Sequence, residues 1–151
     1  MFYKPNNMKI KLVKKADEKL LHALEKLIPQ LTPHGAPITK ESIEAIINPN
    51  NDSELLIAMD SENNIVGTLT LVVFTIPTGK KAFIEDVIVD ESARGLGLGK
   101  LLMEKAIEIA KEKKVLRIEL SSRPMRVPAN RLYLSMGFKV RETNFYRLEL
   151  S

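Results

Sequence analysis

The stretch VIVDESARGLGLGKLL, residues 87 to 102, constrains the fold of this chain more than any other segment. It joins an apolar run typical of a strand to a pattern typical of an amphipathic helix, with three alternating glycines between them. The chain contains seven glycines, so nearly half of them stand here. Glycine permits left-handed backbone and lets a ligand approach the main chain closely. The segment therefore predicts either a tight strand-to-helix turn or a binding loop.

The rest of the chain predicts one mixed α/β (α+β) domain that spans residues 1–151, without internal repeats. Helices are indicated by apolar residues on one face and by capping residues such as Asp17 and Thr39, and strands by alternation bounded by turn residues. The predicted elements, in chain order, are a strand at 8–13, helices at 17–29 and 39–49, strands at 54–60, 65–74 and 82–90, a helix at 98–114, a strand at 115–120, a helix at 128–136, and strands at 138–140 and 145–150.

Composition excludes several classes of chemistry. The chain has no cysteine, so neither disulfides nor thiolate catalysis are available, and His22 and His34 have no acidic cluster around them at metal-ligand spacing. We therefore expect no metal site. The first residues lack the pattern of a signal peptide, and no apolar run is long enough to span a membrane. We expect a cytoplasmic protein without a membrane partner.

The glycine spacing excludes the two best-known nucleotide motifs. A dinucleotide fingerprint would need its third glycine where Lys100 stands, and a Walker A loop would need its first glycine where Arg94 stands and a hydroxyl residue where Leu101 stands. What remains is a strand that turns through bare backbone into a helix N-terminus, where free N–H groups bind anions. Arg94 and Lys100 add positive charge at this end, which the helix dipole disfavours unless an anion is bound.

The sequence IEDVIVDESARGLGLGKLL resembles the acyl-CoA signature of the GNAT superfamily of N-acetyltransferases. Arg94, Gly97 and Gly99 occupy the fixed positions of that signature. A second segment, ANRLYLSMGF, is similar to the later helix and strand of the family. The resemblance implies a GNAT-like central mixed, mostly antiparallel sheet of six to seven strands flanked by about four helices.

The resemblance also implies that acetyl-CoA is the cosubstrate. The strand residues Val87, Ile88 and Val89 would pair with the extended pantetheine arm. Many relatives carry an asparagine seven residues before the family's tyrosine. Here Arg126 stands at that position, and Asn130 lies nearer to the tyrosine in the sequence. Either residue is a candidate contact to the coenzyme. Arg126 together with Arg123 could instead contact the phosphates of the coenzyme or an anionic acceptor. The pyrophosphate would lie on the loop formed by Arg94, Gly95, Leu96, Gly97, Leu98, Gly99 and Lys100.

Two side chains are candidates for the proton transfers that amine acetylation needs. Tyr133 occupies the family's position for the general acid, since a phenol can donate a proton to the departing thiolate. Glu85 is the candidate base, directly or through water, and Asp86 is its neighbour on the opposite face of a regular strand. A backbone N–H near Val87 would hold the thioester oxygen.

The resemblance implies an enzyme that acetylates a primary amine of a small molecule or a peptide. One alternative is a coenzyme-binding sensor module without turnover, which the retained Tyr133 and Glu85 disfavour. Another is a small nucleic-acid-binding domain, suggested by an isoelectric point near 9.3 and a net charge of +4. The basic and aromatic residues are scattered, which disfavours a nucleic-acid partner. The sequence leaves the amine acceptor undetermined and a homodimer open.

Overall fold

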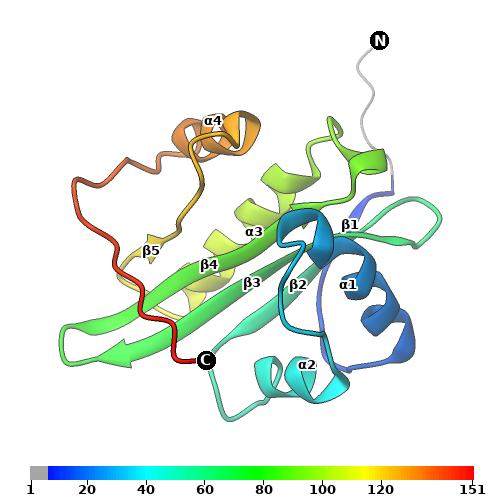
Figure 1. The fold of residues 1–151 in the computed structure, drawn as a ribbon, viewed down its shortest axis with the longest axis horizontal. Coiled ribbons are helices and arrows are strands. Elements are labelled where there is room, and N and C mark those ends of the chain that lie inside the picture. Colours follow the sequence, from blue (N-terminus) through cyan, green and yellow to red (C-terminus); the bar gives the residue numbers. More distant parts are fainter. Residues whose placement is uncertain (1–6) are drawn as a thin grey trace. The chain divides into compact units, whose positions relative to one another are not determined.

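The computed structural model describes residues 7–151. They fall into two compact units, the first ending at Leu120 and the second spanning Ser121–Ser151 (Figure 1). The expectation of one domain over 1–151 stays a prediction. The first unit contains the sheet, three of the helices and the glycine-rich loop, and the second contains the last helix.

The first unit is built on a five-stranded sheet in the order β1-β2-β3-β4-β5. Neighbouring strands are antiparallel except β4 and β5, which are parallel. The elements of this unit are β1 (Lys9–Leu12), α1 (Glu18–Leu31), α2 (Lys40–Ile46), β2 (Glu54–Met59), β3 (Ile65–Ile76), β4 (Gly79–Val89), the 3-10 turn η1 (Glu91–Ala93), α3 (Leu98–Glu112) and β5 (Ile118–Glu119).

Helices cover both faces of this sheet. On β2, alternate side chains point to opposite faces, and Leu55 and Ile57 join a buried cluster with Leu24 of α1 and Ile43 of α2. On the other face, the space above Gly67 of β3 is filled by the side chain of Leu102 from α3. Figure 1 shows the same arrangement, with α1 and α2 on one side of the strands and α3 on the other. The strands are therefore apolar on both faces.

Side-chain caps mark the starts of α1 and α2 as the sequence predicts. The Asp17 carboxylate accepts a hydrogen bond from the Leu20 N–H at 2.9 Å, and Thr39 and Ser42 form a reciprocal capping box. One boundary differs, because α1 continues past Pro29 to Leu31. The helical hydrogen bonds continue beyond the proline, since the Thr32 N–H donates to the Ile28 carbonyl at 2.9 Å.

A β-bulge interrupts β4 at the pair of carboxylates. Thr70 of β3 is opposite Glu85 and Thr68 is opposite Ile88, so Asp86 and the following valine together face the single residue Leu69. Asp86 has a left-handed backbone with φ of 51°. The regular alternation that the sequence analysis assumed for Glu85 and Asp86 therefore does not hold, and both side chains are exposed.

The predicted count of six to seven strands is wrong, because residues 7–151 contain five. The segment predicted as a strand at 115–120 pairs only through β5, and the segments at 138–140 and 145–150 are not strands. Tyr146, Leu148 and Leu150 alternate as a strand would, yet they are 85%, 82% and 90% exposed. Alternation stabilises a strand only beside a neighbour that supplies backbone hydrogen bonds, and the second unit contains none.

The second unit is organised around α4 (Val127–Ser135). Gly137 follows this helix with a left-handed φ of 95°, and the Phe138 N–H returns to the Tyr133 carbonyl at 3.1 Å. This closure is a usual way to end a helix, and it places Phe138 beside Tyr133. In the described part of the chain, no helix has the length and apolar character needed to cross a membrane.

Candidate active site

The loop between β4 and α3 has the open backbone that the glycines predict. Gly95 and Gly97 have left-handed φ values of 81° and 80°. A Cβ atom built on either glycine would have no heavy atom within 4 Å. Packing within the described structure therefore does not explain these glycines, but the backbone conformation does. The loop presents bare main chain to its surroundings.

The start of α3 has the features of an anion site. Gly97 is the N-cap and makes no side-chain capping bond, and the first turn contains no acidic residue. Leu101 is the first residue whose N–H bonds back into the helix, at 3.1 Å from the Gly97 carbonyl. The preceding N–H groups, those of Leu98, Gly99 and Lys100, have no intrahelical partner, and with the helix dipole they favour a bound anion.

Two cations stand beside this turn. Lys100 lies 3.8 Å from Glu104 one turn further along α3. The Nε of Arg94 donates to the Val89 carbonyl at 3.2 Å, so it bonds the last residue of β4. Both side chains are exposed to solvent. They can therefore be rearranged toward an anionic ligand at low cost.

The end of β4 has one unpaired edge. β5 pairs only with Ala82 and Phe83, and in the described chain no strand flanks β4 beyond them on that side. The Asp90 N–H donates to the Val66 carbonyl of β3 at 2.8 Å. Because residues of an antiparallel pair alternate in direction, the polar groups of Val89 point away from β3 toward the open edge, whereas Ile88 faces its partner Thr68. At this edge the Val89 carbonyl accepts a hydrogen bond from the Arg94 side chain and pairs with no strand in the described chain.

The Glu85 carboxylate at the bulge has a perturbed electrostatic environment. Glu85 is opposite Thr70, which in turn pairs with Leu55 of the cluster beneath α1 and α2. Although Glu85 stays exposed, neighbouring atoms partly desolvate its carboxyl, and this desolvation, with a smaller effect of the adjacent Asp86 charge, raises the pKa of Glu85 above its ordinary value. A carboxylate with a raised pKa is a better proton acceptor than an ordinary one.

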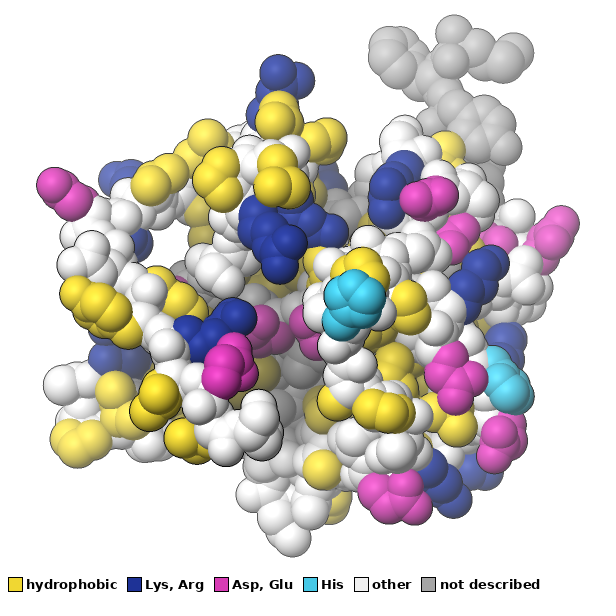
Figure 2. All heavy atoms as spheres, viewed as in Figure 1, with side chains coloured by type: hydrophobic (Ala, Val, Ile, Leu, Met, Phe, Trp, Pro, Cys, Tyr) yellow, Lys and Arg dark blue, Asp and Glu magenta, His cyan; other side chains and the backbone are white. Residues whose placement is uncertain are grey.

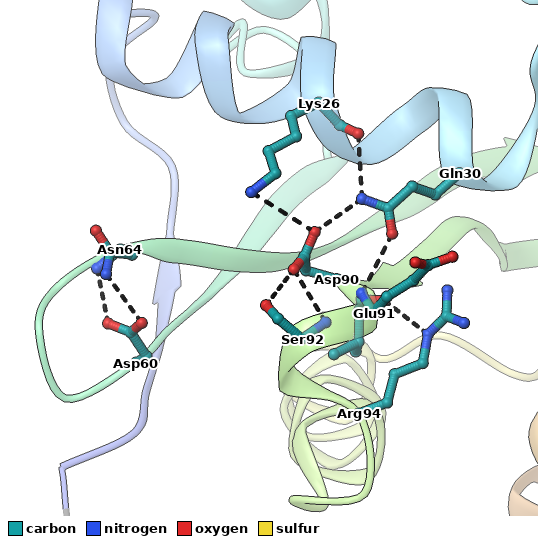
Figure 3. Close-up of polar contacts among 9 residues, drawn as sticks. Lys26, Gln30, Asp60, Asn64, Asp90, Glu91, Ser92 and Arg94 are labelled. Atoms are coloured by element: carbon teal, nitrogen blue, oxygen red, sulfur yellow. Dashed lines mark hydrogen bonds and ion pairs between the residues drawn. The ribbon is translucent and has the colours of Figure 1, made fainter.

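A polar cluster that the sequence analysis missed connects α1 to the loop (Figure 3). Asp90 is only 6% exposed. Its carboxylate accepts hydrogen bonds from the Ser92 N–H and hydroxyl, and from the Gln30 side chain at 2.8 Å. Lys26 of α1 lies 3.9 Å away. Chiefly the Ser92 and Gln30 bonds hold the pKa of Asp90 at about 2.

A shallow cavity of about 240 Å³ lies where α1 leads into the loop before α2. Prolines and aliphatic side chains line most of it, and Glu25 contributes a carboxylate. None of the predicted site residues lines this cavity. Acidic side chains also stand among the basic ones over α1 and α2 on the face shown in Figure 2, so this region is not a continuous basic surface.

In the second unit, Tyr133 lies on α4 and is half-buried. Its ring meets that of Phe138 edge to face, with centroids 6.1 Å apart. Burial raises the pKa of the Tyr133 phenol, although the nearby Arg126 guanidinium partly opposes the shift. The side-chain amide of Asn130 donates to the Arg123 carbonyl at 3.0 Å, which fixes the start of the helix.

Comparison with known proteins decides the family. The model of the Acetyltransferase (GNAT) family matches residues 20–138, most of the chain. The chain belongs to the GNAT family. Members of this family are acetyltransferases that use acetyl-CoA, which agrees with a loop that offers bare backbone and a helix N-terminus.

Two curated relatives match part of this GNAT chain. Glucosamine 6-phosphate N-acetyltransferase of Trypanosoma brucei brucei is 37% identical over 89 residues, which cover 57% of this chain and 58% of the relative. Probable glucosamine 6-phosphate N-acetyltransferase 2 of Oryza sativa subsp. japonica is 38% identical over 80 residues, covering 49% and 48%. The matches thus span about half the length of each relative.

Solved structures superpose on nearly the whole length of this GNAT chain. An acetyltransferase of Trypanosoma brucei superposes with a TM-score of 0.74 at 25% identity, covering 95% of this chain and all of the other. AAC(6')-Iy, solved in complex with the bisubstrate analogue CoA-S-monomethyl-acetylneamine, superposes with a TM-score of 0.76 at 18% identity, covering 95% of this chain and 99% of the other. The second likeness concerns the fold alone.

The predicted site residues of this GNAT chain divide between the two units. The residues from Val87 to Lys100 follow one another along the end of β4, the loop and the first turn of α3, and Glu85 precedes them on the same strand. Arg126, Asn130 and Tyr133 belong to the second unit. Among residues 7–151 there is no group of three acidic or histidine side chains placed to hold a metal ion. The roles of all these residues stay predictions.

Proposed function

We propose that this GNAT chain transfers the acetyl group of acetyl-CoA to a primary amine of a small molecule or a peptide. The uncapped start of α3 carries the proposal, because Gly95 and Gly97 hold a left-handed, open backbone directly after β4. Membership of the GNAT family supports acetyl-CoA as the donor. The open edge of β4 supports binding of the pantetheine arm along the main chain of Val87 and Val89.

In this proposal two side chains move the protons. The thioester of acetyl-CoA supplies the activated acetyl group. Glu85 accepts a proton from the attacking amine, directly or through water, and its raised pKa supports this role. Tyr133 donates a proton to the sulfur as the carbon–sulfur bond breaks. A phenol is protonated at neutral pH, as a proton donor must be, and burial of Tyr133 raises its pKa further above that range.

The acceptor we propose to test first is an amino-sugar phosphate. Two relatives are glucosamine 6-phosphate N-acetyltransferases, although they match about half of their length. The net charge of +4 also suits an anionic acceptor better than a polyamine. Glucosamine, a peptide with a free N-terminus and an aminoglycoside complete the first set of acceptors.

The coenzyme site is tested by replacing Gly97 with alanine. Alanine disfavours the left-handed backbone of Gly97, which sets the direction of the N–H groups proposed to bind the pyrophosphate, so we expect the Kd for CoA, measured by calorimetry, to rise about tenfold or more. The matched control is Gly137→Ala, since Gly137 is also left-handed with nothing within 4 Å of a built Cβ. Both variants carry a similar backbone strain of about 1–2 kcal/mol. Equal CoA affinity of Gly97→Ala and the wild type would refute the loop assignment.

Turnover is tested by following the free thiol of CoA as it is released. The chain contains no cysteine, so a thiol reagent detects only the product. We expect release that depends on both acetyl-CoA and one of the amines. If CoA binds but no amine in a broad screen releases thiol, the protein is a coenzyme-binding module rather than an enzyme.

A further inference from the structure

One side chain of α1 connects to the glycine-rich loop across 60 residues of sequence. The Nε2 of Gln30 donates to Oδ1 of Asp90 at 2.8 Å, and its Oε1 accepts from the Glu91 N–H at 3.2 Å. The same Nε2 also reaches the Lys26 carbonyl at 3.3 Å, within its own helix. A single planar amide thus binds the carboxylate of Asp90, the residue after β4, and the first N–H of the turn that follows (Figure 3).

The two groups that Gln30 holds determine the path of the chain into the loop. The Asp90 N–H bonds the Val66 carbonyl of β3, and the Asp90 carbonyl accepts from the Ala93 N–H at 2.9 Å. Its carboxylate caps the N–H of Ser92. These bonds close η1, after which Arg94 enters the loop directly. Any rotation of Asp90 would therefore change the starting direction of the loop.

We propose that Gln30 is a positioning residue for the coenzyme loop, which it holds in its binding conformation by fixing Asp90 and the Glu91 N–H. The inference rests on the proposed function, because it assigns the loop to CoA. The side-chain hydrogen bonds of Gln30 go to Lys26, Asp90 and Glu91, none of them a predicted coenzyme residue, so it acts through Asp90 and η1. When a loop is in its binding conformation for only a fraction of the time, the apparent Kd for the ligand equals the intrinsic Kd divided by that fraction.

A glutamine is suited to this position because its amide offers an NH2 donor group and a carbonyl acceptor in one plane. The donor meets a carboxylate and the acceptor meets an N–H. A glutamate would keep the bond from the Glu91 N–H but would set a second carboxylate against Asp90. The other charged group facing Asp90 is Lys26 from α1, whereas the charged ends of Glu91 and Arg94 in its own loop point away from it (Figure 3).

The experiment compares Gln30→Ala and Gln30→Glu with the wild type, by calorimetric titration of the full chain with CoA from pH 5 to pH 8. We expect Gln30→Ala to raise the Kd about tenfold at every pH. For Gln30→Glu we expect a similar loss at pH 8 that recovers toward pH 5, since two adjacent carboxylates share one proton and the pKa of the pair rises. Each affinity is divided by that of the wild type at the same pH, which removes the titration of CoA itself.

The matched control is His22→Ala, which removes an exposed side chain of α1 whose charged neighbours are Glu18 and Glu25 of the same helix. It should bind CoA like the wild type. Hydrogen exchange of the ligand-free proteins gives a second measurement, in which the amides of residues 91–97 should exchange faster in Gln30→Ala than in His22→Ala.

The outcomes separate the two proposals. Unchanged CoA affinity in Gln30→Ala, with a wild type that binds CoA, overturns the positioning role and leaves the proposed function standing. A loss in Gln30→Glu that is the same at every pH overturns it as well, since general destabilisation would have that result. A wild type that binds no CoA refutes the proposed function and with it the coenzyme role of Gln30, while the exchange of residues 91–97 still decides whether Gln30 holds the loop.

Discussion

Replacing Gly67 with alanine is expected to destabilise the first unit, because no space exists for the added methyl group. The glycine lies in β3 between two strands and below α3. An ideal Cβ would stand 3.2 Å from the Ala58 Cβ, 3.3 Å from the Ile88 carbonyl oxygen and 3.3 Å from Cδ1 of Leu102. Ordinary contacts of this kind are wider, and Ala58 and Leu102 are fully buried. Two of the three neighbours cannot rotate out of the way.

The expected change in the free energy of unfolding results from two opposing effects. Overpacking a filled core costs about 1–3 kcal/mol, and the smaller backbone entropy of the unfolded alanine chain returns about 0.4–1 kcal/mol. We expect a net loss of about 1–2 kcal/mol in the free energy of unfolding, which lowers the Tm of a chain of this size by roughly 2–8 °C. The measurement is thermal unfolding followed by circular dichroism, together with urea titration.

The matched control is Gly35→Ala. A Cβ at Gly35 would find its nearest neighbour at 3.5 Å, an ordinary contact, so this variant should be neutral or slightly stabilised. In a Leu102→Ala background one of the three close contacts is gone, so the loss caused by Gly67→Ala should shrink there. A Gly67→Ala protein that unfolds at the wild-type temperature would contradict the packing argument.

Two further predictions concern the proposed proton transfers. The raised pKa of Glu85 means that a base in this position is protonated, and inactive, at acidic pH. Glu85→Gln should therefore lower kcat/KM and remove the acidic limb of its pH profile, and a limb of unchanged shape would exclude Glu85 as the base. Tyr133→Phe should leave the Kd for acetyl-CoA unchanged and reduce turnover by more than about tenfold, so wild-type turnover in this variant would exclude Tyr133 as the acid.

Much of the fold of the first unit follows from sequence patterns, because each helix and long strand there buries a periodic apolar face. The bulge in β4 does not follow, since the left-handed residue is Asp86 and no glycine marks it. The predicted strand at 145–150 failed for another reason. Its alternation is real, but a strand also needs a partner, and pairing is a property of the tertiary structure.

In the candidate site, too, some residues can be predicted from the local sequence, whereas others depend on tertiary contacts. Gly95 and Gly97 could be recognised from the sequence because a left-handed backbone selects glycine, and the start of α3 could be recognised from its periodicity. Gln30 could not. Its position on α1 carries no pattern of its own, and its partners lie 60 and 61 residues away, so only folding brings them together.

The described loop combines a fixed backbone with charged side chains that are held weakly. Gln30 and Ser92 bind the buried carboxylate of Asp90, and such charge-assisted bonds are among the stronger ones in proteins. Arg94 and Lys100 have exposed partners, the Val89 carbonyl and Glu104, which contribute little. If the loop binds a pyrophosphate as proposed, the two cations can exchange these partners for phosphate oxygens at small cost. The backbone N–H groups need no such change, so the geometry of the site would be set by the main chain and its affinity adjusted by the two side chains.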